Sequence, residues 1–133
     1  MSIVNSWLPG ARVLDLFAGS GALGLEALSR GAESIDFVEI APRSLSAIST
    51  NADRLSAADN ITLHRVDALR FIEKLEPHAY DVAFADPPYG MGLAERVAEA
   101  WLEKPFAHIL GIEHTARERL PAGATSARTV VQQ

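Results

Sequence analysis

The hydrophobic positions along the chain follow two alternating patterns. Short runs rich in branched aliphatic residues are each followed by a longer stretch in which apolar residues recur every three or four positions. The first pattern indicates buried β-strands and the second indicates amphipathic helices. Strands are predicted over residues 12–17, 34–39, 61–66, 80–85, 108–113 and 128–132, and helices over residues 22–30, 42–55, 68–75 and 92–103.

This order of elements predicts the fold class. Strands that alternate with helices form βαβ units, in which right-handed crossovers place the helices on both faces of a parallel sheet. We therefore expect an α/β, Rossmann-like fold with a mostly parallel central sheet. Ligands of such sheets bind beyond the carboxyl ends of the strands, so residues at those ends are the first candidates for function.

Local signals support several of the predicted helix ends. Gly31 is placed to cap the end of one helix, Pro42 suits the first turn of the next, and Asp67 is placed as an N-cap. The helix that starts at Pro42 is expected to bury one apolar face. That face consists of Leu45, Ile48, Ala52 and Leu55.

The two ends of the chain carry weaker patterns. Residues 1–8 have apolar side chains at helical spacing before a Pro-Gly turn, which predicts a short helix docked through Trp7; a frayed terminus is the alternative. Toward the other end, residues 117–120 are predicted to form a turn of helix and residues 121–126 a loop. No repeat or low-complexity segment interrupts this order.

Length and composition restrict the class of protein. At 133 residues the chain has the size of one domain, residues 1–133, and its 48% apolar and 22% charged residues are typical of a packed globular core. The absence of cysteine excludes disulfides and thiolate chemistry, and the cytoplasm is the expected location. No signal segment or membrane-spanning run of about 18 apolar residues is present, so no membrane role is expected. The four histidines are not at metal-ligand spacing, and no metal site is expected.

A glycine-rich segment lies between the first predicted strand and helix. Gly19, Gly21 and Gly24 fit the pattern G-x-G-x-x-G, which lets a ligand approach the backbone closely at the start of a helix. The pattern alone also fits a tight strand-to-helix turn in which Gly24 permits close packing. A nicotinamide-dependent dehydrogenase is a further interpretation of the same glycines.

Polar residues at the next two strand ends favour a nucleoside-containing ligand. Glu39 ends the second predicted strand, where a carboxylate can accept the hydroxyls of a ribose. Asp67 ends the third, where it could accept from an adenine amino group while the amide of Ala68 contacts a ring nitrogen. A purely structural role for Asp67, as a helix N-cap, is compatible with this binding role.

The sequence Asp86-Pro87-Pro88-Tyr89 follows the fourth predicted strand and is the strongest chemical signal. The carboxylate of Asp86 and the carbonyl of Pro87 can both accept hydrogen bonds from one amine, and Tyr89 offers a face on which an unstacked base can lie. This combination predicts group transfer to an exocyclic amine of a nucleobase. The alternative is a capped turn with Tyr89 packed in the core.

Charge complicates a nucleic-acid function. The formal net charge is −5, whereas nucleic-acid-binding proteins usually neutralise phosphates with lysine and arginine. Either a local basic patch exists, or a basic substrate-binding segment lies outside this chain.

The same motifs resemble those of RsmD-like methyltransferases, which act on small-subunit ribosomal RNA. The resemblance covers residues 7–120 and is carried by residues 15–32, Val38-Glu39, Asp67-Ala68 and residues 86–89. It implies a Rossmann-like class I methyltransferase fold, S-adenosylmethionine as the methyl donor, and ribosomal RNA or the small ribosomal subunit as partner. The implied product is a guanine methylated at its N2 amine.

The resemblance also implies roles for individual residues. Asp86 and Tyr89, with Pro87, would be the catalytic positions. Glu39 and Asp67, with Ala68, would hold the ribose and adenine. The methionine end of the donor would lie against the first motif. The candidate residues there are Asp15, Phe17, Gly19 and Gly21.

Two departures from the family pattern leave other functions open. Family members usually carry a longer basic segment before the first helix and a further strand after the last one, so we expect the fold to be shortened at both ends, with an unpaired sheet edge. Such a chain could instead be a non-catalytic module that binds S-adenosylmethionine. The loop at residues 86–89 also resembles that of DNA adenine-N6 methyltransferases, although these usually carry an added target-recognition region.

Overall fold

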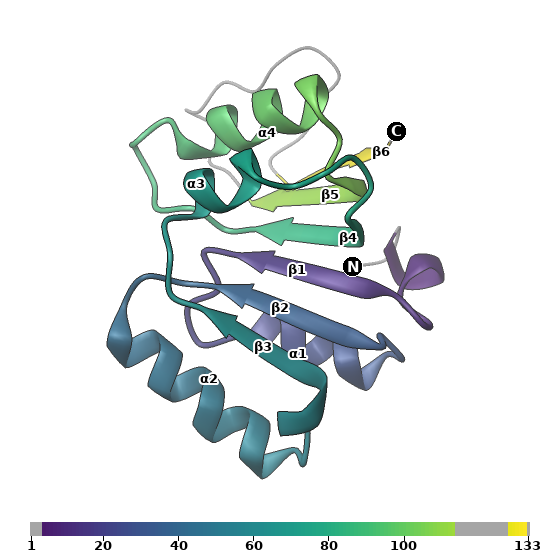
Figure 1. Ribbon diagram of the computed structural model, residues 1–133, viewed down its shortest axis with the longest axis vertical. Coiled ribbons are helices and arrows are strands. Elements are labelled where there is room, and N and C mark those ends of the chain that lie inside the picture. The colour runs from purple at the N-terminus through teal and green to yellow at the C-terminus, as the bar shows by residue number, and fades with distance from the viewer. Residues whose placement is uncertain (1–3, 114–127, 133) are drawn as a thin grey trace.

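The computed structural model describes residues 4–113 and 128–132 and contains a six-stranded sheet with the order β3-β2-β1-β4-β5-β6 (Figure 1). Strands β1 to β5 are parallel, and β6 pairs antiparallel with β5. The expected α/β fold with a mostly parallel sheet is therefore confirmed. The strands are β1 (Arg12–Leu16), β2 (Ser34–Val38), β3 (Ile61–His64), β4 (Tyr80–Ala85), β5 (Ala107–Glu113) and β6 (Arg128–Gln132).

Helices cover both faces of the sheet, as the sequence predicts. Alternate residues of a strand point to opposite faces, so Val13 and Leu14 belong to different core clusters. Helices α1 and α2 pack on the face of Val13, and α3 and α4 pack on the face of Leu14. The helices are α1 (Ala22–Ser29), α2 (Pro42–Arg54), α3 (Ala68–Glu73) and α4 (Leu93–Glu103), with 3-10 helices η1 (Val4–Trp7) and η2 (Ala58–Asn60).

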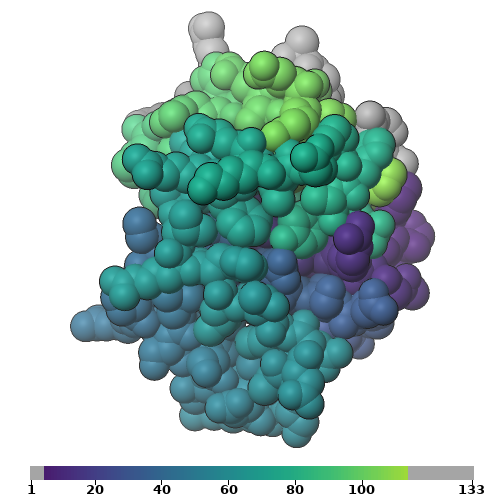
Figure 2. Space-filling model, viewed as in Figure 1, coloured from purple at the N-terminus to yellow at the C-terminus, as the bar shows by residue number. Residues whose placement is uncertain are grey.

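The space-filling view shows how the second of these faces is covered. Side chains from the region of β3 and α3, drawn in teal, lie across its middle, and those of α4, drawn in green, lie above them (Figure 2). Among residues 4–113 and 128–132, no helix is long and apolar enough to cross a membrane.

The predicted helix caps are confirmed. Gly31 follows the last turn of α1 with a φ of 103°, and its N–H donates to the carbonyl of Leu28 (3.0 Å). Pro42 occupies the first turn of α2. Asp67 caps α3, because its Oδ2 accepts a hydrogen bond from the backbone N–H of Arg70 (3.1 Å). These contacts fix where each helix begins or ends relative to the sheet.

Three strands end one or two residues earlier than predicted. Strand β1 stops at Leu16 because Phe17 has a φ of 57°, a left-handed conformation that cannot continue a strand. Strands β2 and β3 stop at Val38 and His64, before the turns that lead to the next helices. The early ends place the loops that follow them directly at the carboxyl edge of the sheet.

The amino-terminal segment is anchored by one residue more than the one predicted. It forms the 3-10 helix η1, and Trp7 is 36% exposed, whereas the neighbouring Leu8 is fully buried. Trp7 instead stacks on the ring of His108, with the ring centroids 6.1 Å apart. The segment therefore docks through Trp7, as predicted, and also through Leu8, which the sequence analysis did not single out and which enters the core.

The predicted apolar face of α2 is also shorter than expected. The helix ends at Arg54, so Leu55 lies beyond its last turn and is 62% exposed. Ile48 and Ala52 are buried as predicted, and Leu45 is half-buried. The helical turn predicted at residues 117–120 and the loop at residues 121–126 lie outside the described residues.

Replacing Gly24 with alanine is expected to destabilise the fold, although alanine favours helices. A Cβ at Gly24 would overlap the ring of Phe37 and the side chain of Ile35, which are both fully buried in β2. We expect the free energy of unfolding, measured with urea, to fall by about 1–3 kcal/mol. Gly111→Ala is the control, because its Cβ would lie 3.4 Å from the ring of Phe84. Equal losses in the two variants would contradict this packing argument.

Candidate functional site

The strands that carry the predicted site residues end at one edge of the sheet. Strands β1, β2, β3 and β4 run in the same direction, so their carboxyl ends meet there (Figure 1). A glycine loop, residues 17–21, follows β1, and Glu39, Asp67 and Asp86 follow β2, β3 and β4. The topology therefore brings together residues that are distant in the sequence.

The glycines of the loop serve different purposes. Gly19 and Gly21 have φ angles of 56° and 82°, which glycine adopts without strain. A Cβ at Gly19 would meet no atom within 4 Å, whereas one at Gly21 would meet Ile48 and Phe37. Gly19 therefore borders open space that a ligand can enter, and Gly21, like Gly24, permits close packing.

Glu39 holds the glycine loop and the start of α2 through backbone amides. Its Oε1 accepts a hydrogen bond from Gly19 N–H (2.8 Å), and its Oε2 accepts from Ile40 N–H (2.9 Å) and Ala41 N–H (2.8 Å). A carboxylate has about four lone-pair positions, so one remains for a ligand hydroxyl. To accept both hydroxyls of a ribose, Glu39 would have to replace its hydrogen bond from Gly19 N–H with one from the second hydroxyl.

Asp15 is buried beneath the glycine loop. It is 2% exposed, and its Oδ2 accepts a hydrogen bond from Gly24 N–H (3.0 Å). Burial raises the pKa of Asp15 to about 8, and the negative charges of Asp86 and Glu39 contribute to the increase, which outweighs the opposing effect of the Gly24 hydrogen bond. A group with this pKa changes charge close to neutral pH, in the strand that leads into the glycine loop.

The raised pKa of Asp15 predicts how stability depends on pH. The folded chain keeps this proton up to about pH 8, whereas an unfolded aspartate loses it near pH 4, so folding stability is lost as the pH rises through that window. We expect Asp15→Asn to reduce this loss by about 1–3 kcal/mol between pH 5 and pH 8, measured by urea unfolding. Asp53→Asn, at an exposed position on α2, is the control. An unchanged slope in Asp15→Asn would contradict the prediction.

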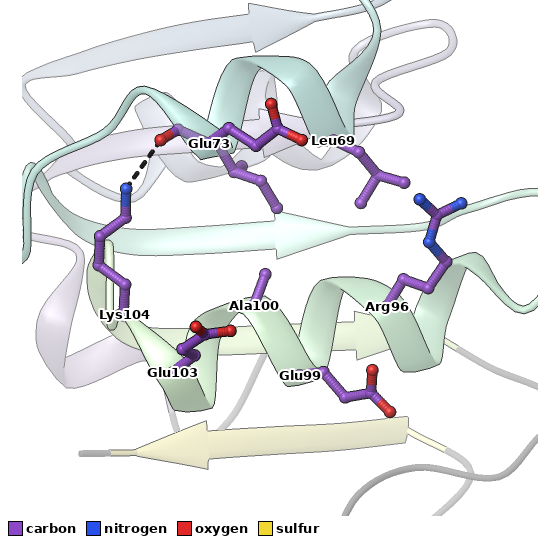
Figure 3. A pocket seen from close by; sticks show the side chains of 8 residues that line it. Leu69, Glu73, Arg96, Glu99, Ala100, Glu103 and Lys104 are labelled. Carbon is purple, nitrogen blue, oxygen red and sulfur yellow. Dashed lines mark hydrogen bonds between the residues drawn. The ribbon is translucent and has the colours of Figure 1, made fainter.

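A small cavity of about 40 Å³ gathers several predicted residues. Glu39, Asp67 and Ala68 line it together with Phe17, as predicted from their strand ends. Ligand pockets for molecules of nucleoside size are several times larger, so a ligand there requires the lining side chains to move apart. A larger cavity, of about 430 Å³ between α3 and α4, contains none of the predicted residues (Figure 3).

Three residues of this small cavity were missed by the sequence analysis. They are Val38, Ile40 and Val66. Ile40 is 62% exposed, which is unusual for a large apolar side chain at the edge of a binding cavity. Its signal in the sequence is an isoleucine placed directly after Glu39, outside the strand pattern. Val66 was predicted as the last residue of a strand that in fact ends at His64.

Asp86 lies beside the end of β1. Its N–H donates to the carbonyl of Leu16 (3.4 Å), so the backbone of Asp86 lies next to the start of the glycine loop. Partial burial raises the pKa of Asp86, and the negative charge of Glu113 at the end of β5 raises it further. Proximity to another acid makes Asp86 a better proton acceptor than an isolated aspartate.

The residues after Asp86 divide into buried and exposed positions. Pro87 is buried, whereas Tyr89 is 56% exposed. The alternative in which Tyr89 packs in the core is therefore wrong. An accessible aromatic face next to a carboxylate can stack on a planar ring while the carboxylate accepts from an amine on that ring.

Known proteins resemble this chain over most of its length. A family model described as "Conserved hypothetical protein 95" matches residues 1–132. The chain is 32% identical over 106 residues to the ribosomal RNA small subunit methyltransferase D of Buchnera aphidicola, covering 76% of this chain and 55% of that protein. It is 34% identical over 92 residues to the tRNA1(Val) (adenine(37)-N6)-methyltransferase of Yersinia pestis, covering 65% of this chain and 37% of that protein. The chain thus spans about half the length of the first relative.

Solved structures show the same fold. A putative methyltransferase from Escherichia coli has a TM-score of 0.82 and 25% identity, with 99% of this chain and 81% of that chain covered. A putative methylase from Haemophilus influenzae has a TM-score of 0.79 and 26% identity, with 97% and 89% covered. These likenesses confirm the Rossmann-like fold.

Proposed function

Because this chain belongs to the RsmD-like methyltransferase family, whose model matches residues 1–132, we propose that it transfers a methyl group from S-adenosylmethionine to an exocyclic amine of a nucleobase in RNA. The observation that carries the proposal is the carboxyl edge of the sheet. There Asp86 bonds to Leu16 at the start of the glycine loop, Glu39 bonds to Gly19 of that loop, and Tyr89, three residues after Asp86, is exposed. The N2 amine of a guanine in small-subunit ribosomal RNA is the first acceptor to test.

The glycine loop and Glu39 fit a nucleoside-containing methyl donor. Gly19 leaves its backbone open to a ligand, and Glu39 keeps one acceptor position for a ribose hydroxyl. Asp67 uses only Oδ2 for its cap, so its other oxygen could accept from an adenine amino group beside the amide of Ala68. The methionine end would lie over the loop and Asp15. S-adenosylmethionine, when bound, supplies a methyl group made electrophilic by its sulfonium.

Catalysis by the chain itself then consists of holding and orienting the acceptor. The carboxylate of Asp86 and the carbonyl of Pro87 would accept the two hydrogens of the amine and direct its lone pair toward the donor. Tyr89 would stack on the base, as aromatic residues do with bases taken out of a helix. One of the two amine protons must leave as the new carbon–nitrogen bond forms. Asp86, whose pKa is raised by burial and by Glu113, would accept it.

A second acceptor is supported by one of the relatives. The protein from Yersinia pestis is named as a methyltransferase of adenine N6 in a transfer RNA, and this chain is 34% identical to it over 92 residues. Adenine N6 and guanine N2 are both exocyclic amines, so the arrangement of Asp86 and Tyr89 serves either. The choice between them is a matter of how the base and the surrounding nucleic acid are held.

The test combines binding and transfer. Calorimetric titration with S-adenosylmethionine, with NAD as the control ligand, measures donor binding to the folded chain. Transfer of a labelled methyl group to unmethylated small ribosomal subunits, unmodified transfer RNA and DNA, followed by nucleoside analysis, identifies the acceptor. Saturable donor binding and label in N2-methylguanosine support the proposal. A folded chain that binds no donor contradicts it, and label in N6-methyladenine of DNA contradicts the RNA acceptor.

A further inference from the structure

Four exposed arginines lie around the carboxyl edge of the sheet. Arg43 is near the start of α2, Arg65 follows β3, Arg70 is near the start of α3, and Arg96 is near the start of α4. Helices in this fold begin at the carboxyl edge, so all four residues belong to segments that start at the edge to which the loops of Asp86 and Glu39 also belong (Figure 1). Within the part of the chain that the structure describes, none of the four takes part in an ion pair.

Basic residues at the opposite edge have local structural explanations. Arg54 is the last residue of α2 and Lys74 caps the end of α3, where the helix dipole favours a cation. Arg30, at the end of α1, pairs with Glu26 (2.9 Å). Lys104, at the end of α4, donates to a carbonyl of α3 (2.9 Å), as the dashed line in Figure 3 shows.

Arg43, Arg65 and Arg96 lack such an explanation, whereas Arg70 also lies in the last turn of the short helix α3, where the dipole favours a cation. Arg43 and Arg96 lie near the starts of the two longest helices, where the helix dipole disfavours a cation. The first turn of α2 contains no acidic residue that could offset this, whereas the first turn of α4 contains Glu95 beside Arg96. Figure 3 shows Arg96 at the end of the α3–α4 groove beside Leu69, without a drawn bond. Cationic residues at helix starts, where the helix dipole disfavours them, indicate a functional role that offsets this cost in stability.

The acidic residues at the carboxyl edge differ in how much of the arginines' positive charge they can offset. Glu39 is bonded by three backbone amides and Asp67 by one, and such contacts disperse their charge into the protein. Asp15 is buried, and its pKa of about 8 keeps it protonated over much of the neutral range. Asp86, Glu95 and Glu113 also lie at this edge, so the positive charge there is confined to the four arginines and is not a net charge of the edge.

We propose that Arg43, Arg65, Arg70 and Arg96 form an arginine rim that contacts the phosphates of the substrate RNA on both sides of Asp86. The proposal rests on the proposed function, since it assumes that the acceptor base belongs to RNA. Arg43 comes from the helix layer on one face of the sheet, and Arg70 and Arg96 come from the layer on the other face. A strand that crosses the edge between these layers can contact both while one base reaches Asp86. Guanidinium groups suit phosphate because they bind it with two parallel hydrogen bonds.

Phosphate contacts of this kind predict a measurable dependence on salt. Each contact to a single strand contributes about 0.7 to the slope of log affinity against log salt concentration. Affinity of the full chain is measured by anisotropy of a fluorescein-labelled, mixed-sequence single-stranded RNA of about 20 nucleotides, between about 25 and 200 mM salt. The rim variant replaces Arg43, Arg65, Arg70 and Arg96 with glutamine. The opposite-edge variant makes the same change at Arg30, Arg54, Lys74 and Lys104, and removes the same number of charges.

The rim variant is expected to lose roughly 30-fold or more in affinity at about 100 mM salt, with the slope reduced by about 3. The opposite-edge variant is expected to change by less than about threefold. Equal losses in both variants, no loss in the rim variant, or no RNA binding by the wild-type chain would overturn the proposal. Circular dichroism melts show that each variant is folded.

Donor binding separates this proposal from the function it rests on. The rim variant is expected to bind S-adenosylmethionine as the wild type does, because no rim side chain belongs to the donor site. If the wild-type chain binds the donor and methylates RNA while the rim variant binds RNA normally, the rim is wrong and the function stands. If the rim variant loses RNA affinity and the opposite-edge variant does not, while the wild type transfers no methyl group, the arginine rim is supported and the proposed function is wrong.

Discussion

Asp86→Asn is expected to lower the rate of methyl transfer by roughly 100- to 1,000-fold, with donor affinity changed by less than about twofold. The amide keeps the shape of the side chain and one acceptor oxygen. It loses the negative charge that would favour positive charge on the attacking nitrogen, and it cannot take the departing proton. Single-turnover transfer at saturating donor measures the loss, and calorimetry measures donor affinity.

The control for Asp86→Asn is Asp81→Asn, at the other end of the same strand. Asp81 accepts a hydrogen bond from Arg12 N–H (2.8 Å) and lies away from the carboxyl edge. Its replacement is expected to change stability and to leave the transfer rate per folded molecule unaltered. Transfer that continues at the wild-type rate in Asp86→Asn would exclude Asp86 as the group that orients the amine.

Glu39→Ala is expected to have the second large effect, on donor binding and stability together. The substitution removes the acceptor for a ribose hydroxyl and leaves three backbone N–H groups without their partner. We expect donor affinity to fall at least about 100-fold and the free energy of unfolding to fall by about 2–3 kcal/mol. Titration below the melting temperature of the variant separates the two effects.

Glu33→Ala and Glu39→Gln complete this experiment. Glu33 is exposed and directly precedes β2, so its replacement should leave both donor affinity and the free energy of unfolding near wild type. Glu39→Gln keeps one acceptor oxygen and is expected to recover much of the stability and little of the donor affinity. A Glu39→Ala chain that binds the donor normally would contradict the ribose-binding role and leave Glu39 as a support of the loop.

The fold could be predicted from local patterns wherever a strand is bounded by polar or turn residues. Tyr80–Ala85 has the predicted bounds because Asp86-Pro87 interrupts the apolar run at its end. Strand ends followed by further apolar residues were placed too late. Phe17 and Val66 have strand-like side chains, and only the backbone turn that tertiary contacts impose shows that the strands have already ended.

The positions of the site residues could be predicted, but not their environments. Parallel strands bring Glu39, Asp67 and Asp86 to one edge whatever their exact contacts. The three amides on Glu39 and the raised pKa of Asp15 depend on the path of the glycine loop, which the spacing of glycines does not define. The arginine rim is scattered along the sequence, so only the arrangement of helix starts reveals it.

The sheet order has a consequence for how this chain acquires its site during synthesis. The first part to be synthesised contains β1, β2 and β3 with α1 and α2, and its strands can pair locally. Val13 of β1 can pair with Val82 only after β4 has been synthesised. Such distant pairings are the slow part of folding. The glycine loop and Glu39 belong to the part that is synthesised first and Asp86 to the later part, so pairing of β4 with β1 is needed to bring the two functional groups together. A nascent chain would present the residues for the donor before the residue that receives the acceptor.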